Sequence, residues 1–186
     1  SYVAGIVGKV SGIAVSGVSK SDVLITNCAN EASITGDDHI GGIVGWSQTN
    51  TRLNGCYNTG NIHGGANVGG LVGYLQEYTG TCEVKNSYNT GRVTGSSAVG
   101  GIIGNMYNGV SVANCYNAGP STYAIAGNFY NNTYSITNSF FLGVNSAKSV
   151  PDFVYVEGKE VTGRATAKSA ADIASEDFAA LLGDAF

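Results

Sequence analysis

Charged residues and prolines are scarce in this chain of 186 residues. Asp, Glu, Lys and Arg together make up 12% of the sequence, two residues are Pro, and the formal net charge is −4. The nine Lys and Arg residues are scattered, so they form no basic patch of the kind that binds nucleic acid or an anionic membrane surface. We therefore expect no nucleic-acid partner.

Long apolar runs are missing as well. No run approaches the roughly 18 apolar residues that a membrane-spanning helix needs, and no charged segment followed by an apolar one opens the chain as in an export signal. We expect no membrane insertion. Because the chain begins inside a repeated motif, at Ser1–Gly5, we also expect it to be cut from a longer protein, with any export signal upstream and other domains on its flanks.

The four cysteines, Cys28, Cys56, Cys82 and Cys115, include no CxxC pair and have no His at the spacing of a zinc site. We expect no metal and no cofactor. Small residues stacked in an interior are favoured over a disulfide framework, since an isolated Cys is among the most buried residue types.

What the chain does contain is glycine in a repeating pattern. Gly41–Gly45 reads GGIVG, and the pattern returns at Gly69–Gly73 and Gly100–Gly104, with weaker copies at Ala4–Gly8 and Tyr123–Gly127. A fixed period of this kind is typical of repeat architectures.

A second motif alternates with this glycine marker. Its Cys or Ser position recurs about every 28 residues, at Cys28, Cys56, Ser87, Cys115 and Ser139. In three consecutive repeats the distance from this position to the second Gly of the next marker is 14 residues, whereas the other half of the repeat varies from 11 to 20 residues. Insertions therefore collect on one side of the repeat unit.

Each repeat holds three short β-rich segments and no stretch of helical period. Segments this short cannot bury an apolar side alone, but stacking the equivalent segments of successive repeats pairs every strand and builds a continuous interior. The predicted fold is therefore all-β, a parallel β-helix or solenoid of about five coils. The glycines would mark corners that need φ above zero or close backbone approach, and Asn would suit the turns.

Equivalent residues in such a stack lie about 4.8 Å apart, so several rows are expected to interact. Asn27, Asn86, Asn114 and Asn138 would form a hydrogen-bonded ladder that Gly55 interrupts. Aromatic rings would stack in a second row, made of Ala29, Tyr57, Tyr88, Tyr116 and Phe140. Whether this row or the Cys/Ser row faces inward stays open, because strict alternation breaks at the Asn.

An antiparallel sandwich or prism, with hairpins turning at Asn58–Gly60 and Asn89–Gly91, would also explain short strands with turn residues. The constant 14-residue half favours the solenoid, because hairpin proteins have no need for every third connection to keep one length.

The composition changes near residue 147. Residues 1–147 hold 18 Asn and 11 charged residues, and residues 148–186 hold no Asn and 11 charged residues. The domains predicted are a solenoid over 1–147 and, over 148–186, a hairpin plus short helices that cap it. The hairpin is expected over Phe153–Val161, a helix start at Ser169–Asp172, and a short helix over Ser175–Gly183. Its apolar stripe, which would close the open end, is Ile173, Phe178, Leu181 and Leu182.

The two motifs together resemble the GLUG repeat, over residues 4 to about 143 and most strongly in the second to fourth units. The resemblance implies a β-helical, extracellular module found in long surface or secreted proteins of bacteria. These include immunoglobulin A1 proteases, where the repeats lie outside the catalytic domain. The family motif carries no catalytic residues, so the resemblance assigns none here.

The acidic residues do not suggest an enzyme. Carbohydrate-active β-helices cluster carboxylates or cations on adjacent coils, and glycosidases pair carboxylates roughly 5–10 Å apart. Here the acids are not repeat-equivalent, and Asp37 and Asp38 beside a turn Gly are interpreted as turn residues. His39 and His63 fall at different aligned positions, so a metal pair is not expected. An ice-binding face would need a row of Thr, but only Thr35 and Thr94 align.

Aromatic residues just past each marker are the candidate ligand-binding residues, because loops of differing length on a rigid stack are where recognition residues tend to lie. The candidates are Trp46, Tyr74, Tyr107 and Tyr130, next to Met106 and Phe129; buried, this group would instead be ordinary core. The leading hypothesis is a non-catalytic module of a bacterial surface or secreted protein, a spacer or adhesive stalk that binds glycan or host protein. The alternative is a carbohydrate-active β-helix.

Overall fold

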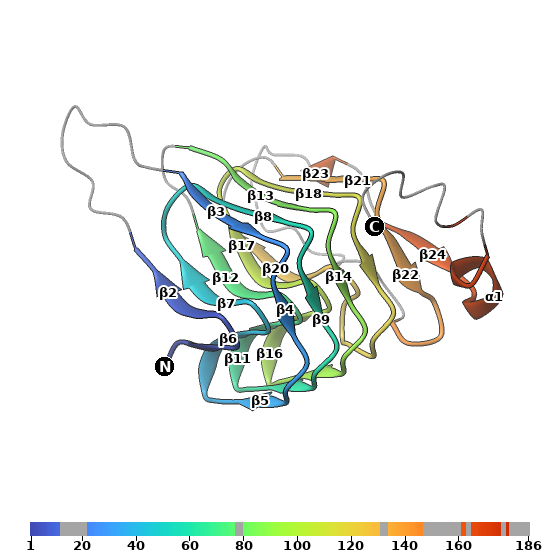
Figure 1. Ribbon diagram of the computed structural model, residues 1–186, viewed down its shortest axis with the longest axis horizontal. Coiled ribbons are helices and arrows are strands. Elements are labelled where there is room, and N and C mark those ends of the chain that lie inside the picture. The colour runs from blue at the N-terminus through green and yellow to red at the C-terminus, as the bar shows by residue number, and fades with distance from the viewer. Residues whose placement is uncertain are drawn as a thin grey trace.

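The computed structural model describes residues 1–11, 22–76, 80–130, 134–146, 161–162, 165–175 and 178. Within them the chain forms a parallel β-solenoid of about four turns. Every strand pair is parallel, and each strand pairs with the equivalent strand of the next coil (Figure 1). The predicted fold class is confirmed, and the antiparallel alternative is wrong. The sequence suggested about five coils, but the end repeats supply only part of a coil.

Five sheets run along the stack. Three of them enclose the larger lobe. The first of these contains β2 (Val7–Val10), β7 (Val44–Ser47), β12 (Val72–Gln76), β17 (Ile103–Tyr107) and β20 (Ala126–Tyr130). The second contains β3 (Val23–Thr26), β8 (Thr51–Asn54), β13 (Cys82–Lys85), β18 (Val110–Ala113), β21 (Tyr134–Thr137) and β23 (Val161–Thr162). The third contains β4 (Ala29–Asn30), β9 (Tyr57–Asn58), β14 (Tyr88–Asn89), β19 (Tyr116–Asn117), β22 (Phe140–Leu142) and β24 (Thr166–Lys168).

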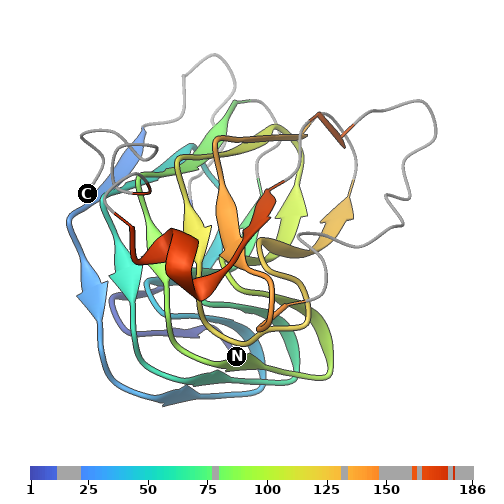
Figure 2. The same ribbon diagram turned by 90° about the vertical axis from the view of Figure 1, so that its right-hand side faces the viewer.

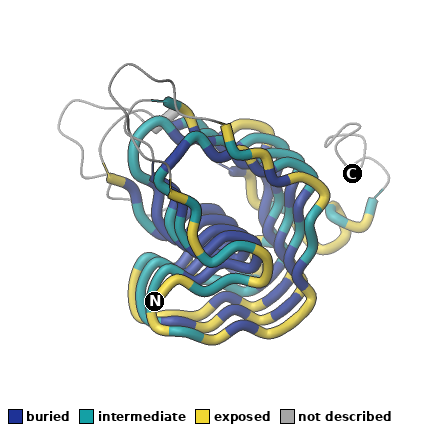
Figure 3. The backbone as a smooth tube through the Cα atoms, turned by 60° about the vertical axis from the view of Figure 1, so that its left-hand side comes forward, coloured by how far each residue is buried: buried dark blue, intermediate teal, exposed yellow. Residues whose placement is uncertain are grey.

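Two further sheets enclose a smaller lobe. One contains β5 (Ile34–Thr35), β10 (Ile62–His63) and β15 (Val93–Thr94). The other contains β1 (Val3–Ala4), β6 (Asp38–Gly41), β11 (Ala66–Gly69) and β16 (Ser97–Gly100). Figure 3 shows the coils close to end on, with the wide lobe above, the flat lobe below, and the N-terminus at the indentation between them. Each lobe has its own apolar core.

The Cys/Ser row faces inward, which answers the question that the sequence left open. Cys56, Ser87, Cys115 and Ser139 are buried, and Cys28, in the first coil, is half-buried against the same core. The aromatic row lies on the outside. The rings of Tyr57 and Tyr88 stack at 5.1 Å between centroids, and those of Tyr88 and Tyr116 at 4.9 Å, as predicted.

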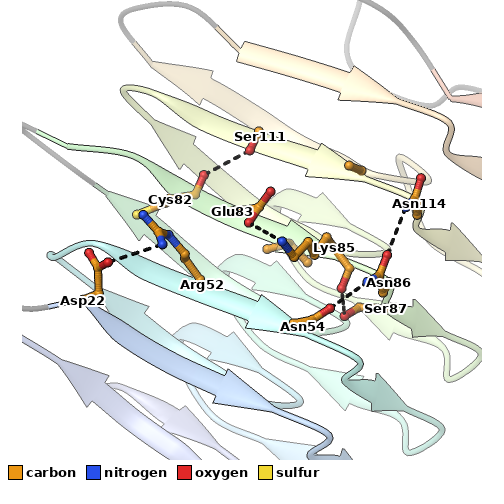
Figure 4. Close-up of polar contacts among 12 residues, drawn as sticks. Asp22, Arg52, Asn54, Cys82, Glu83, Lys85, Asn86, Ser87, Ser111 and Asn114 are labelled. Atoms are coloured by element: carbon orange, nitrogen blue, oxygen red, sulfur yellow. Dashed lines mark hydrogen bonds and ion pairs between the residues drawn. The ribbon is translucent and has the colours of Figure 1, made fainter. Parts of the chain in front are cut away.

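The predicted Asn ladder forms on the outer face beside these rings for Asn86, Asn114 and Asn138. Asn138, Asn114 and Asn86 each donate a side-chain hydrogen bond toward the preceding coil, and the last of these bonds ends on Asn54 (Figure 4). Asn27, Asn86, Asn114 and Asn138 all have φ between 40° and 53°, in the left-handed region that Asn tolerates. Because Gly55 lacks a side chain, the neighbouring Asn54 takes over its place in the ladder.

A second Asn ladder is buried, and the sequence did not suggest it. The side-chain amides of Asn30, Asn58 and Asn89 each donate to the Asn of the next coil at 2.6–2.8 Å. These three amides and that of Asn117 also donate to a turn carbonyl two residues on at 2.8–2.9 Å. Asn117 ends the ladder and donates its other bond to the Ser121 hydroxyl at 3.1 Å. The marker glycines pack against this ladder. A Cβ added to Gly42 would lie 2.7 Å from Asn58 Oδ1, and one added to Gly70 would lie 2.5 Å from Asn89 Cγ.

This contact explains why the repeat needs both motifs and a constant distance between them. The marker glycines do not have positive φ, since the positive-φ glycines among the described residues are Gly55 and Gly109. Of the two reasons offered for the marker glycines, close backbone approach is therefore the one that applies.

The tail adds to the stack rather than standing apart from it. β23 pairs with β21, and β24 pairs with β22, so two sheets continue past residue 148. The helix α1 (Ala170–Ile173) begins with a capping box between Ser169 and Asp172, as predicted, and lies in front of the last coil, at the C-terminal end of the stack (Figure 2). Phe178 packs edge-on against Tyr116 and Phe140 at 5.7 and 5.4 Å.

Two predictions for the tail remain untested. The hairpin over Phe153–Val161 and the helix through Leu181 and Leu182 lie almost entirely outside the described residues. The domain boundary at residue 147 likewise stays a prediction.

Candidate functional site

The indentation between the two lobes, called the notch here, is lined by two rows of side chains that run along the stack. In one row, each residue directly precedes the apolar residue that a strand of the β1 sheet turns toward the core. This row consists of Tyr2, His39, Asn67 and Ala98. The other is an outward row of the β2 sheet and consists of Lys9, Trp46, Tyr74, Asn105 and Asn128. The rows face each other, so the identities of these side chains decide what the notch can hold.

The first row sits on unusual backbone. His39, Asn67 and Ala98 have φ of 56°, 56° and 49°, in the left-handed region. Asn and His enter this region more readily than other non-glycine residues, whereas Ala pays a steric cost there. The left-handed residue interrupts the strand alternation, and the His39 and Asn67 side chains contact the second row.

At the N-terminal end, aromatic rings fill the notch. Tyr2 stacks on Trp46 at 4.8 Å between centroids and 16° between planes. His39 packs against Trp46 at 5.9 Å and against Tyr74 at 5.5 Å. The Lys9 Nζ lies 4.4 Å from the Trp46 ring centroid, within cation–π range.

Burial leaves two nitrogens in this cluster without a partner. His39 Nδ1 and Trp46 Nε1 are buried and have no hydrogen-bond partner in the described part of the chain. Burial lowers the pKa of His39, and the opposing effect of the Asp38 carboxylate is smaller. His39 is therefore neutral at pH 7, and Lys9 carries the positive charge of the cluster.

Toward the C-terminal end the notch opens. Ala98 occupies the position of His39 and Asn67, and it lines a pocket of about 800 Å³, called the Ala98 pocket here. The wall is made largely of amide and phenol groups, from Asn67, Asn105, Asn128, Tyr74, Tyr123 and Tyr130. None of the described residues that line it carries a formal charge at pH 7.

One wall residue has an unsatisfied polar atom. Asn105 is 6% exposed, and its Nδ2 donates to Asn67 Oδ1 at 2.8 Å. Its Oδ1 has no hydrogen-bond partner among the residues that the structure describes. A buried carbonyl oxygen of this kind costs about 1–3 kcal/mol if it stays unpaired. The pocket wall therefore contains a buried acceptor whose hydrogen bond is not made.

The predicted ligand-binding residues do not lie together in one site. Tyr74 and Tyr130 line the Ala98 pocket, whereas Trp46 belongs to the filled half of the notch. Tyr107 pairs in register with Tyr130, with 6.2 Å between ring centroids, but does not line the pocket. The adjacent Met106 and Phe129 are core residues.

Eight pocket residues were not singled out from the sequence as a site: Ala66, Asn67, Ser97, Ala98, Asn105, Tyr123, Gly127 and Asn128. The alignment of Asn67 and Ala98 with His39 is visible in the sequence, and so is the replacement of Trp46 and Tyr74 by Asn105. What the alignment lacks is the notch itself, because the sequence does not show that the two rows face each other.

Asp38, interpreted from the sequence as a turn residue, begins strand β6, and the hydrogen bonds of Asp37 and Asp38 join segments far apart in the sequence. Asp38 Oδ1 accepts the backbone N–H of Ala66 at 2.9 Å, and Asp37 accepts the Ser1 hydroxyl at 3.5 Å. His63 aligns with Thr35 and Thr94 as predicted. The described ranges contain no group of three His, Cys, Asp or Glu residues placed to hold a metal, and none of their helices could span a membrane.

Comparison with known proteins agrees with the repeat and the fold. Residues 64–94 match the family model described as the GLUG motif, so the predicted GLUG repeat is confirmed there. This segment runs from the turn before β11 to the end of β15, one circuit of the stack. No curated protein matches the chain.

A solved structure has a similar fold. It is a Bacteroides ovatus protein provisionally described as an immunoglobulin A1 protease, and the alignment covers 98% of this chain and 81% of that one. The two are 17% identical with a TM-score of 0.51, a likeness that concerns the fold alone.

Proposed function

We propose that this segment is a non-catalytic, extracellular repeat module of a bacterial surface or secreted protein, which acts as a spacer and binds glycan through the notch. The observation that carries the binding role is the unpaired, buried Asn105 oxygen in a pocket walled by amides and phenol rings. Glycans offer many hydroxyl donors together with apolar ring faces, and such a wall is complementary to both.

The spacer role is supported by the way in which the coils are joined. Hydrogen-bonded ladders, a ring stack and the strand pairs run from coil to coil along the stack. In a stack of this kind each repeat mainly contacts its neighbours, so coils can be added without redesigning the rest. The extracellular location is supported by the likeness to a protein described as a protease of immunoglobulin A1, which is an extracellular substrate.

The absence of catalysis is also part of the proposal. Hydrolysis of a glycosidic bond requires two carboxyl groups roughly 5–10 Å apart on either side of the bond. Among the described residues, no Asp or Glu lines the Ala98 pocket. Asp38, outside the pocket, already accepts a backbone N–H. A carbohydrate-active enzyme remains the alternative that the experiment must exclude.

The test measures binding and turnover on the same purified chain. A glycan array identifies ligands, and a reducing-end assay on soluble polysaccharides detects depolymerisation. Tyr130, which is 51% exposed, gives the cleanest aromatic variant, and Tyr130→Ala is expected to weaken glycan binding. Trp46→Ala tests the filled half, with circular dichroism to check folding. Tyr57→Ala, in the outer ring stack, is the matched control and should bind as wild type does.

The outcomes separate the hypotheses. Glycan binding without turnover supports the proposal, and loss on Tyr130→Ala places the ligand at the notch. Turnover of any polymer contradicts the non-catalytic role. Binding of a host protein by a chain that binds no glycan would contradict glycan as the partner.

A further inference from the structure

We infer that the Ala98 pocket is a binding site for an uncharged saccharide, whose hydroxyl group donates to Asn105 Oδ1 and whose ring packs against Tyr130. This inference rests on the proposed glycan-binding function and makes it specific in two respects. It places the ligand at the C-terminal half of the notch rather than on the aromatic cluster, and it selects neutral over acidic glycans.

Residue 98 has a smaller side chain than the equivalent residues of the two preceding coils. The equivalent positions of the two preceding coils hold His39, which packs on Trp46 and Tyr74, and Asn67, which binds Asn105. By the same geometry, an Asn at position 98 would meet Asn128, one coil further on. The methyl group of Ala98 makes no such contact with the second row, and the pocket lies beside it.

The backbone makes this choice of residue notable. A φ of 49° is disfavoured for Ala by roughly 1–2 kcal/mol, and Asn or Gly would accept it more readily. Local structure alone would therefore favour Asn, as at position 67. Strained positions of this kind cluster at functional sites, and here the strained residue is the one that keeps the pocket open.

Asn105 supplies the fixed polar contact. It is more than nine-tenths buried, and its orientation is set by the bond that its Nδ2 donates to Asn67. Its free Oδ1 can only accept a hydrogen bond, so the complementary ligand atom is a donor, as in a sugar hydroxyl. The pocket volume of about 800 Å³ lies within the range of roughly 300–1,000 Å³ that small-ligand sites occupy.

The charges around the notch favour a neutral ligand. The described residues that line the pocket carry no Lys or Arg to pair with a carboxylate or sulfate. The cation of the notch, Lys9, lies at the other end over the Trp46 ring. The chain itself has a net charge of −4, which opposes polyanions further.

The experiment uses two substitutions at one position. Ala98→Asn restores the residue of the preceding coil, which the backbone accepts, but places an amide side chain in the pocket. Ala98→Gly relieves the same backbone strain and leaves the pocket open. Laminarin, yeast mannan and xyloglucan oligosaccharides serve as neutral probes, and oligogalacturonate and heparin as acidic ones. Calorimetric titration gives the affinities, and thermal melting reports folding.

We expect at least one neutral probe to bind and the acidic probes to bind more weakly. Ala98→Asn should lose roughly tenfold or more in affinity while its melting temperature stays at or above that of wild type. Ala98→Gly should keep the affinity, and Asn105→Ala should lose roughly tenfold. Because both substitutions at 98 suit the backbone, lost binding in Ala98→Asn would not come from unfolding.

The failures are distinguishable. If Ala98→Asn binds neutral probes as wild type does while Trp46→Ala does not, the pocket assignment is wrong and the glycan-binding module stands. Stronger binding of an acidic probe contradicts the neutral ligand alone. If no probe binds and the glycan array is blank, both the inference and the proposed function fail.

Discussion

The corner at Asn58, Asn89 and Asn117 and the notch at His39, Asn67 and Ala98 belong to the same repeat but follow opposite rules. At the corner, each of these amides packs against a marker glycine and donates to the turn carbonyl two residues on, and the amides of Asn58 and Asn89 also donate to the Asn of the next coil. At the notch, the equivalent position changes from an imidazole to an amide to a methyl group. The comparison teaches that the corner holds the stack together, while the notch is where the repeat can vary to acquire a binding site.

The largest effect is expected from a side chain added at the corner. In Gly70→Ala the new Cβ would lie 2.5 Å from Asn89 Cγ and would also overlap the carbonyl oxygen of Gly101. We expect a loss of more than about 4 kcal/mol in the free energy of unfolding, or failure to fold, as measured by urea denaturation. Gly143→Ala is the control, because its Cβ would lie 3.5 Å from the nearest atom. Equal stability of the two variants would contradict the account of the corner.

The next effect comes from breaking the buried ladder. Asn89→Ala removes the acceptor of the Asn58 amide and the donor to both Asn117 and the Gly91 carbonyl. The expected cost is about 2–4 kcal/mol, because buried groups are left unpaired. Asn61→Ala, on an exposed Asn that accepts one backbone N–H, should cost well under 1 kcal/mol. A ladder variant no less stable than the Asn61 variant would show that the amides contribute little.

Alkaline pH should weaken the interior beside this corner. Burial raises the pKa of Cys115 to about 12, above its value in the unfolded chain. The stabilisation is therefore complete below about pH 9 and is lost as the pH rises toward 12, since the unfolded thiol ionises first. Ser is the residue at the equivalent positions Ser87 and Ser139. Between about pH 8 and 10, the free energy of unfolding of Cys115→Ser should therefore fall by about 1 kcal/mol less than that of wild type. Urea denaturation at the two pH values measures this. If wild type and Cys115→Ser lose the same free energy of unfolding between these pH values, the prediction is wrong.

The smallest effect is expected at the notch, and in the opposite direction. Ala98→Gly removes a side chain from left-handed backbone, so it should stabilise the chain by about 0.5–1 kcal/mol in thermal melting. Adding a methyl group at the corner, in Gly70→Ala, would then lower the free energy of unfolding, whereas removing one at the notch, in Ala98→Gly, would raise it. A destabilised Ala98→Gly variant would mean that the Ala98 methyl group is part of the packing.

Much of the stack could be predicted from the sequence because its causes repeat. The fold class, the row of Tyr57, Tyr88 and Tyr116, and the outer Asn ladder follow from equivalent residues at one strand spacing. The direction of the Cys/Ser row could not be predicted, because Asn86 and its equivalents adopt left-handed φ and break the alternation that reports inside from outside. The buried ladder was missed for the same reason, although its Asn directly follows Tyr57, Tyr88 and Tyr116.

The candidate site was only partly predictable. Tyr74 and Tyr130 were identified because aromatic residues follow each marker, and both line the pocket. The pocket itself depends on a residue that is small where its equivalents are large, and on a notch that exists only after β6, β11 and β16 fold back beside the β2 sheet. Repeated residues can be recognised from the sequence, whereas position 98 departs from the repeat and is therefore not marked by it.

The most direct test of the division between corner and notch is a nuclear magnetic resonance titration of the isotope-labelled chain with a neutral laminarin oligosaccharide. The account predicts shifts confined to the Ala98 pocket, with the side-chain amide of Asn105 among the most affected and those of Asn58, Asn89 and Asn117 unchanged. Shifts centred on the outer rings of Tyr57 and Tyr88, with the Asn105 amide unmoved, would contradict it.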